Sequence, residues 1–482
     1  MTDPGRVPRR GASRRRNQLG QSMGAKGLRT REKLLSETEA LLSTTPLREL
    51  TVAQIVRRAN TSTATFYVYF NDVSAAVYAL IGELTQSPPS MLVLFARPWD
   101  SALALDRAHE FVASYFERCL QHAAAFRVRN LASDEGEQRF TELRVNAVLP
   151  LLSVMAERIT ERQRAGDLPA DLHPLSAAGA LLAMIDRISI VQISALSTVT
   201  RPRQLDVAAF FSALLFGGRA PDLRGIPAHT FEAELPAEKR PIDARYGSPH
   251  RNETTAPVNL HGQVIGPKGA RTRHRIIEVT EDLLRTQSLL DLSVAKIAKA
   301  AETSTSTFYL YFQDVPAAVL SVIAEISQSS PQLRLLWEGD WGETAPPARA
   351  EAFVTRYVEH WQAHKALFRV RNLAAEEGDE RFIELRAASA RPLLDAMEAR
   401  IVRCQTEGRF PPGLHPRSAA GGCLAMIERL AATPNLDNEA GTTIRTVSHA
   451  AAYFVSFLMG RLPVGTFETS LSRTPARPSA GS

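Results

Sequence analysis

The sequence predicts an all-α protein built from two tandem copies of one helical unit. Apolar residues recur at helical spacing along most of the 482 residues, and no stretch shows the alternation typical of a β-strand. The second half of the chain also repeats the first, since 61–70 and 303–312 are identical at eight of ten positions. Each unit spans roughly 200 residues, so this duplication governs the domain organisation.

The first part of each unit is expected to hold four helices. In the first unit a helix over 31–43 places its apolar residues on one face. A short helix follows Thr51, the hydroxyl residue expected as its N-cap. After a turn of about three residues comes a second short helix within 61–70, and Asp72 is expected to cap a fourth helix ending at Leu84. Two short helices joined by a tight turn form a helix-turn-helix, whose second helix enters the DNA major groove.

The rest of each unit predicts long amphipathic helices. In the first unit they are expected over 102–122, 137–165, 174–198 and 205–217. The last two, with their counterparts 416–432 and 446–460, are the most apolar and are rich in small residues. Small residues permit close approach between helices, so these four helices are expected to form an interface between the two units. The alternative is that they are plain core within each unit.

The two helix-turn-helix segments resemble the DNA-binding domain of TetR-type repressors over 29–84 and 271–326. The aromatic ending Phe-Tyr-x-Tyr-Phe of each recognition helix carries this resemblance. The tandem arrangement is similar to actinobacterial double-TetR regulators, some of which control lipid-import operons. The resemblance implies a DNA-binding transcriptional repressor released by a small hydrophobic, lipid-like ligand. The alternative functions are a structural DNA-binding protein without a ligand switch and, less favoured, a small-molecule-binding protein that no longer binds DNA.

The resemblance also implies which residues contact DNA. Thr51 and Ser293 would face phosphate at a helix N-terminus, where the helix dipole favours an anion. The residues expected to face bases or nearby backbone are Thr63, Ala64, Thr65 and Tyr67, with counterparts Thr305, Ser306, Thr307 and Tyr309. Tyr69 and Tyr311 stand where the family usually has His and would reach phosphate. The phenylalanines Phe66, Phe70, Phe308 and Phe312 are expected in the core.

Two departures from the family pattern affect the heads. Val73 and Val315 stand where a Lys is common, which predicts one phosphate contact fewer in each head. The turn usually holds Gly, but here it holds Asn60 and Glu302. Asn adopts the left-handed conformation more readily than Glu, so the second turn is expected to be held less rigidly.

The regulatory half of each unit is expected to hold a ligand pocket, by the same resemblance. Candidate pocket residues are Phe111, Tyr115, Phe116 and Phe126, then Phe353, Tyr357, Trp361 and Phe368. Ordinary packing is the alternative for each of them. The motif Phe-Arg-Val-Arg-Asn-Leu-Ala occurs at 126–132 and again at 368–374. Its two arginines are two residues apart, so at most one of each pair can face a pocket, and salt bridges to Glu135 or Glu377 are the favoured alternative.

Composition, together with the resemblance, sets the expected domain boundaries. These are a basic disordered arm at 1–25, helix-turn-helix domain 1 at 26–88, regulatory domain 1 at 89–218, a Pro/Gly-rich linker at 219–266, helix-turn-helix domain 2 at 267–330, regulatory domain 2 at 331–462, and a disordered tail at 463–482. Residues 1–31 carry nine Arg or Lys against one acid, which is typical of segments that contact polyanions. A solubilising tail is the alternative. A second, shorter basic arm is expected at 268–275, before the second helix-turn-helix.

The remaining sequence features favour a cytoplasmic protein that is not an enzyme. Three cysteines show neither metal-ligand spacing nor a disulfide framework. No motif of a nucleophilic hydrolase, zinc protease, P-loop or dinucleotide site occurs. We therefore expect no cofactor, no metal and no membrane span. The expected partners are double-stranded DNA with an imperfect inverted repeat and a small-molecule effector. The linked pair of units is expected to act as a pseudo-dimer, and further self-association is allowed.

Overall fold

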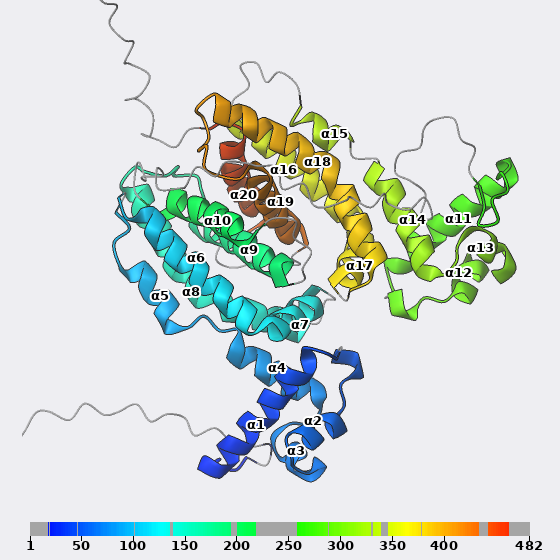
Figure 1. The fold of residues 1–482 in the computed structure, drawn as a ribbon, viewed down its shortest axis with the longest axis horizontal. Helices are drawn as coiled ribbons and strands as arrows, with labels where there is room; N and C mark the ends of the chain where they lie inside the picture. The colour runs from blue at the N-terminus through cyan, green and yellow to red at the C-terminus, as the bar shows by residue number, and fades with distance from the viewer. Residues whose placement is uncertain are drawn as a thin grey trace, which may run out of the picture. The chain divides into compact units, whose positions relative to one another are not determined.

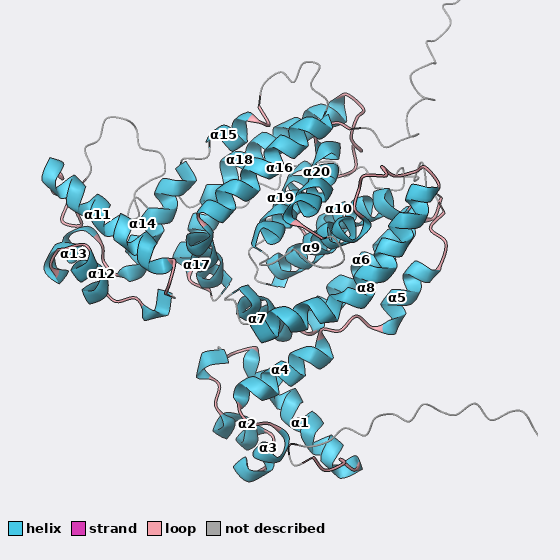
Figure 2. Ribbon diagram, turned by 180° about the vertical axis from the view of Figure 1, so that it is seen from behind, coloured by secondary structure: helices cyan, strands magenta, loops and turns pink. Residues whose placement is uncertain are grey.

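A computed structural model of the chain describes the residues that follow: 18, 20–45, 47–100, 102–134, 138–193, 200–217, 258–287, 289–328, 331–338, 346–376, 378–432 and 442–461. Over these ranges the regular structure is helical (Figures 1 and 2), and an isolated antiparallel bridge joins Val258 and Val264. The expected all-α fold is confirmed. The greater part of the predicted linker and the C-terminal tail lie outside the described residues.

Each repeat begins with a four-helix head. The helices of head 1 are α1 (Ala25–Leu42), α2 (Val52–Arg58), α3 (Thr63–Tyr69) and α4 (Val73–Leu84). Those of head 2 are α11 (Pro267–Leu284), α12 (Val294–Ala300), α13 (Thr305–Tyr311) and α14 (Val315–Gln328). A single-turn 3-10 helix precedes α2 and another precedes α12 (Leu47–Glu49 and Leu289–Asp291). The first helices begin earlier than expected, so the basic residues at 26–31 and 268–275 lie on helices α1 and α11 rather than on an arm.

The regulatory helices follow in the same order in both repeats. In repeat 1 they are α5 (Pro89–Ala96), α6 (Ala104–Gln121), α7 (Ala123–Asp134), α8 (Gln138–Arg164), α9 (Pro174–Ile193) and α10 (Arg201–Phe216). In repeat 2 they are α15 (Pro331–Leu335), α16 (Pro346–Ala363), α17 (Lys365–Glu376), α18 (Glu380–Thr406), α19 (Pro416–Ala432) and α20 (Ile444–Leu458). Two helices in the regulatory half of repeat 1, α5 and α7, were not expected. Pro89 begins helix α5, because the N–H that proline lacks would have no partner at the first helical position. The repeated Phe-Arg-Val-Arg motif lies on a short helix of its own, which is α7 in repeat 1 and α17 in repeat 2.

The chain divides into two compact units. One is head 1 with 121–133 and 137–147, and the other comprises the remaining regulatory helices of both repeats together with head 2. Within the second unit, α9 packs along α19 and against α20, while α10 packs on α19 (Figure 1). Gly422 allows this approach, because a Cβ atom there would lie 3.3 Å from Cδ1 of Ile188 and 3.4 Å from Cγ1 of Val207.

Aromatic and polar contacts cross the same interface. The rings of Phe211 and Phe454 lie 5.7 Å apart between centroids, and the Ser176 hydroxyl donates to Oγ1 of Thr446 at 2.9 Å. Helices α9, α10, α19 and α20 therefore join the two repeats, as the small residues predicted. The alternative of separate cores is wrong.

No single helix among the described residues is long and apolar enough to cross a membrane. One bent pair, Thr305–Tyr311 with Val315–Ala324, passes that test together on length and composition alone, with a 51° bend. Both of its helices belong to head 2, and Phe308, Ala318 and Val319 in the pair are fully buried there. Packing within the head thus accounts for its apolar composition.

Candidate DNA-binding heads and regulatory cores

The recognition helices α3 and α13 each begin at a serine cap. The Ser62 hydroxyl accepts from the backbone N–H of Thr65 at 3.1 Å, and Ser304 accepts from that of Thr307 at 3.0 Å. The hydroxyl of Thr65 also lies 2.9 Å from that of Ser62, and the corresponding distance in head 2 is the same. Thr65 and its counterpart Thr307 are half-buried, and their bonds to the serine help to hold the start of the helix. The neighbouring residues 63–64 and 305–306 are exposed.

Buried phenylalanines orient each recognition helix. Phe66 and Phe308 are fully buried, and each packs on the phenylalanine four residues later, as expected for core residues. The ring of Tyr67 packs edge-to-face on Phe66, and the side chain remains 50% exposed. Tyr309 packs on Phe308 in the same way and is 51% exposed. Half-exposed aromatic rings on a helix anchored from below are suited to contact a large partner.

The turn before each recognition helix adopts the left-handed conformation. Asn60 has φ 49° and Glu302 has φ 54°, and they are the non-glycine residues with positive φ among the described residues. The next residues close the turn, because the N–H of Thr61 donates to the Val56 carbonyl at 3.0 Å and that of Thr303 donates to Ala298 at 2.9 Å. Glu302 thus adopts a conformation that suits Asn better than Glu, while the expectation that the second turn is held less rigidly stays a prediction.

The helix before each turn begins at an exposed hydroxyl residue. Thr51 forms a capping box with Gln54, whose side-chain oxygen accepts from the Thr51 N–H at 2.7 Å. In head 2 the Ser293 hydroxyl caps the N–H of Lys296, whose Nζ donates to the Asp291 carbonyl at 2.7 Å. Both helix starts face outward, which is compatible with the phosphate contact expected of Thr51 and Ser293, and that contact stays a prediction.

Tyr69 and Tyr311 are the last residues of the recognition helices, and their hydroxyl groups lie close to the first helix of each head. A Cβ atom on Gly27 would be 3.4 Å from the Tyr69 hydroxyl, and one on Gly269 would be 3.0 Å from that of Tyr311. Glycine at this position therefore lets the tyrosine hydroxyl approach the start of α1 or α11. A phosphate held there would lie near a helix N-terminus, but the contact itself remains a prediction.

A short turn before the first helix of each head was missed by the sequence interpretation. The backbone N–H of Gln18 donates to the Val68 carbonyl on α3 at 3.0 Å, and that of Leu260 donates to Leu310 on α13 at 3.0 Å. Gly20 and Gly262 both have positive φ, at 73° and 76°. A repeated pattern, Asn-x-x-Gly-Gln at 17–21 and 259–263, was the signal that could have found it. The heads thus reach into the segments assigned to the arm and the linker.

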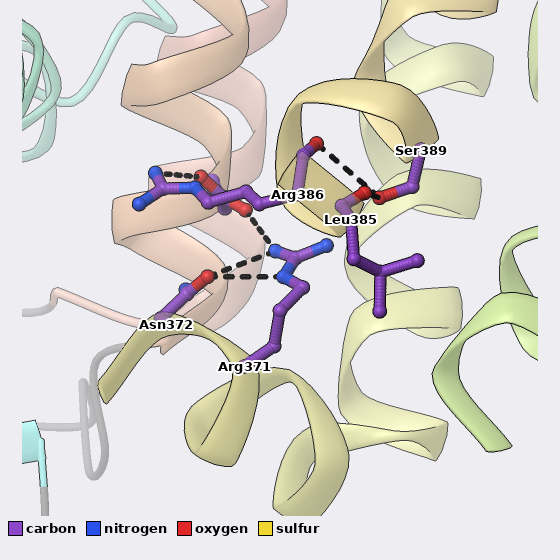
Figure 3. Close-up of polar contacts among 6 residues, drawn as sticks. Arg371, Asn372, Leu385, Arg386 and Ser389 are labelled. Carbon is purple, nitrogen blue, oxygen red and sulfur yellow. Dashed lines mark hydrogen bonds and ion pairs between the residues drawn. The ribbon is translucent and has the colours of Figure 1, made fainter. Parts of the chain in front are cut away.

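The regulatory core of repeat 2 holds a buried ionic cluster. Glu428 on α19 accepts from Arg371 on α17 at 2.5 Å and from Arg386 on α18 at 3.2 Å (Figure 3). Arg371 also donates to the side-chain oxygen of Asn372. Burial by itself raises the pKa of Glu428, but the charges of Arg386, Arg371 and then Arg187 outweigh it and lower that pKa to about 2. Arg187 lies on α9, so the field at this carboxylate includes a residue of the other repeat.

The two arginines of the repeated motif contact different neighbours, as their spacing required. Arg127 on α7 donates to the carbonyl of Leu42, the last residue of α1, at 2.9 Å. Arg371, the second arginine in repeat 2, instead faces the buried Glu428. The salt bridges proposed with Glu135 and Glu377 involve acids outside the described residues. In repeat 1 the second arginine, Arg129, instead donates to the side-chain oxygen of Asn130, so the two arginines of that motif have different partners.

The candidate pocket aromatics lie in the regulatory cores. Phe111, Tyr115, Phe116, Phe126, Phe353, Trp361 and Phe368 are at most 5% exposed, and Tyr357 is partly buried. They pack on other aromatics, since Phe111 contacts Phe95 at 5.0 Å between centroids and Phe353 contacts Trp337 at 5.1 Å. The Tyr115 hydroxyl donates to Asp186 at 3.1 Å. Their ligand-binding role is still a prediction. Among the described residues no cluster of His, Cys, Asp or Glu is suited to hold a metal ion.

Comparison with known proteins identifies both halves of each repeat. The model described as bacterial regulatory proteins, tetR family, matches residues 34–72 and 276–314, which span both helix-turn-helix segments. The tetracyclin repressor-like C-terminal domain matches 92–220 and 334–459. The chain belongs to the TetR family of bacterial regulators. It is also 26% identical over 209 residues to the HTH-type transcriptional regulator EthR of Mycolicibacterium smegmatis. The aligned residues cover 42% of this chain and 92% of that relative. The expected tandem TetR organisation is confirmed, and the chain is a DNA-binding transcriptional regulator.

Proposed function

We propose that this regulator is a repressor whose two heads bind the two halves of one imperfect inverted repeat. The observation that carries the proposal is the helical interface of α9 and α10 with α19 and α20. It joins two TetR repeats within one chain, in the manner of a dimer interface. A two-fold dimer presents equivalent heads to a palindromic operator. A linked pair presents heads that differ, so its operator can be asymmetric.

The base-facing residues proposed are those at the exposed start of each recognition helix, 63–64 and 305–306, with Tyr67 and Tyr309. Their exposure, and the buried phenylalanines beneath them, support this role. Phosphate contacts are proposed for Thr51, Tyr69 and their counterparts in head 2. Thr65 and Thr307 bond to the serine caps, so we expect them to position the helix as well as to contact DNA.

We further propose that a hydrophobic, lipid-like ligand in the regulatory halves releases the repressor. The support is the packing of the short helix α7 or α17 on the head of its own repeat. In repeat 2, α17 packs on α11 and α14 of the head while its Arg371 holds the carboxylate of Glu428. In repeat 1, Nδ1 of His122 lies 2.8 Å from Glu39 on α1. A ligand that displaces α7 or α17 would therefore act directly on the first helix of a head. The proposal places the protein in the bacterial cytoplasm, with DNA, and assigns it no reaction.

Selection from a random pool of duplex DNA tests the operator part of this proposal. We expect an imperfect inverted repeat, and sedimentation of the complex should show one chain engaging both halves. An operator complex that needs two chains, each using one head, would contradict the linked-pair arrangement.

The ligand part is tested separately, by measuring operator affinity in the presence of long-chain fatty acids or sterols. We expect one of these classes to weaken binding. If no hydrophobic compound changes the affinity, the structural DNA-binding alternative is favoured instead.

A further inference from the structure

The turn before the first helix of head 2 is a closed, well-bonded structure. The Asn259 side-chain oxygen accepts from the N–H groups of His261 and Gln263, at 2.9 and 3.0 Å. The Asn259 N–H donates to the Gln263 carbonyl at 2.9 Å, and the bridge from Val258 to Val264 closes the base. Positive φ at Gly262 lets the chain reverse there. This geometry holds the turn in one shape before any partner binds.

Both turns are attached to the same place on the recognition helix. The bonds from 18 to 68 and from 260 to 310 join equivalent atoms in the two repeats. Gln18 adds a side-chain bond to the Tyr69 carbonyl at 3.3 Å. Residues 68–69 are the end of a seven-residue helix, which is about 10 Å long. The major groove that receives such a helix is about 12 Å wide. When α3 lies in the groove as proposed, a segment fixed at the end of the helix would lie next to the sugar-phosphate backbone and the neighbouring minor groove.

The turn of head 2 exposes apolar side chains and is bonded to the recognition helix. Val258 is 53% exposed, Leu260 51% and Val264 69%, and the N–H of Leu260 donates to the carbonyl of Leu310 on α13, a residue that is itself 39% exposed. Lys268 and Arg271, both exposed on the first turns of α11, follow the turn in the chain. Apolar side chains flanked by cations, next to a DNA-reading helix, match the surface that minor-groove proteins place against sugars and base steps.

The turn of head 1 has polar residues at the matching positions. Gln18 stands for Leu260 and Ser22 for Val264, and both are exposed. Amide and hydroxyl groups can bond phosphate, or the acceptors that A·T pairs show in the minor groove. The bonds to the recognition helix are thus kept in both repeats, while the residues presented outward change.

We propose that each turn is a second DNA-contacting element of its head, lying on the backbone and minor groove beside its half-site. The turn of head 1 contacts the flank through Gln18 and Ser22, and that of head 2 through Leu260 and Val264. The two flanks of the operator then differ in kind, which orients the protein on DNA. This inference rests on the proposed operator binding.

Exchange of the outward residues in the full-length chain tests the inference. One variant carries Leu260→Gln with Val264→Ser, and the reciprocal one carries Gln18→Leu with Ser22→Val. We expect the first to lose hydroxyl-radical protection and base preference only beside the half-site of head 2, with operator affinity about tenfold lower, within the range for one lost specific contact. The reciprocal variant should change only the other flank. Val402→Ser, an equally apolar-to-polar change at a 45% exposed site on α18, should have no effect.

A third variant, Gly262→Val, tests the placement of the turn without changing its exposed apolar side chains. A β-branched residue is strained at φ +76°, so the turn should lose its shape and the same flank contact should disappear. Thermal unfolding of each variant checks that the head stays folded.

The outcomes separate this inference from the proposed function. If the wild-type chain selects no sequence, the operator proposal fails and the turn inference fails with it. If it selects an operator but every variant keeps both flanks unchanged, the turns do not contact DNA. If instead chains self-associate without DNA and Leu260→Gln with Val264→Ser abolishes that association, the apolar side chains of the turn form a contact between chains and the inference is overturned.

Discussion

The two heads share their interior and differ at their surface. Buried residues such as Phe66 and Phe308 are identical, and both turns take the left-handed conformation. On the outside, Arg58 pairs with Glu37 at 2.9 Å in head 1, whereas head 2 has an exposed alanine, Ala300, in place of Arg58. Packing constrains interior residues to one shape, while exposed residues can change at little cost. The duplication has therefore kept one scaffold and left its DNA-facing surface free to diverge.

The shared interior should make the two heads equally sensitive to a cavity. Phe66→Ala and Phe308→Ala each remove a fully buried ring, which costs about 3–5 kcal/mol of unfolding free energy. Each variant should lose footprint protection over one half-site only. Val93→Ala, at a 50% exposed site on α5, is the matched control. Loss of both halves from a single change would mean that the heads do not fold separately.

Neutralising Glu428 in the regulatory core of repeat 2 should lower the free energy of unfolding by a similar amount. Glu428→Gln leaves the buried Arg371 and the partly buried Arg386 without their counter-charge, which costs about 3 kcal/mol. The folded-state pKa of Glu428 is lowered to about 2, so its contribution to stability is present above pH ~4.5 and is lost as the pH falls toward 2. Acid unfolding curves of the wild type and the variant should therefore converge at low pH. Glu398→Gln, at a carboxylate with 37% side-chain exposure on α18, serves as the control.

Exchange of Ala64 and Ser306 sharpens the comparison of the heads. These residues lie at the exposed start of the recognition helices, and only the serine can hydrogen-bond a base edge. Ala64→Ser with Ser306→Ala should exchange the preferred base pairs of the two half-sites at this position, with about 1–3 kcal/mol of discrimination per base pair. Footprints on the operator and its inverted version measure this. Equal protection of both orientations by both proteins would show that this position does not orient the chain.

The smallest expected effect concerns the turn at Glu302. A non-glycine residue other than Asn or Asp is disfavoured at φ 54°, so Glu302→Gly should stabilise head 2 by about 1 kcal/mol. Asn60→Gly in head 1 should change little, because Asn tolerates this conformation. Chemical denaturation with a probe in each head would measure both. If Asn60→Gly stabilised its head more than Glu302→Gly does, the greater strain would lie in the turn of head 1.

Local chemistry explains what could be predicted from the sequence. The hydroxyl residue at 51, the aspartate at 72 and the period of apolar residues each act within one or two turns of a helix, so the heads were predicted closely. Small residues on the last helices likewise predicted the interface that Gly422 permits. The helix beginning at Pro89 was missed, because a proline pair marks a break as often as a helix start.

By itself the sequence determined the duplication, the helical fold, the family and the interior of each head, because these depend on periodicity and short-range capping. Tertiary structure alone decided which partners distant residues meet. Arg371 pairs with Glu428, which is 57 residues away in the sequence, and the N–H of Gln18 donates to the carbonyl of Val68 on the recognition helix. Such contacts depend on how helices pack, and a hydrogen bond between segments far apart in the chain leaves no periodic trace in the residues that make it.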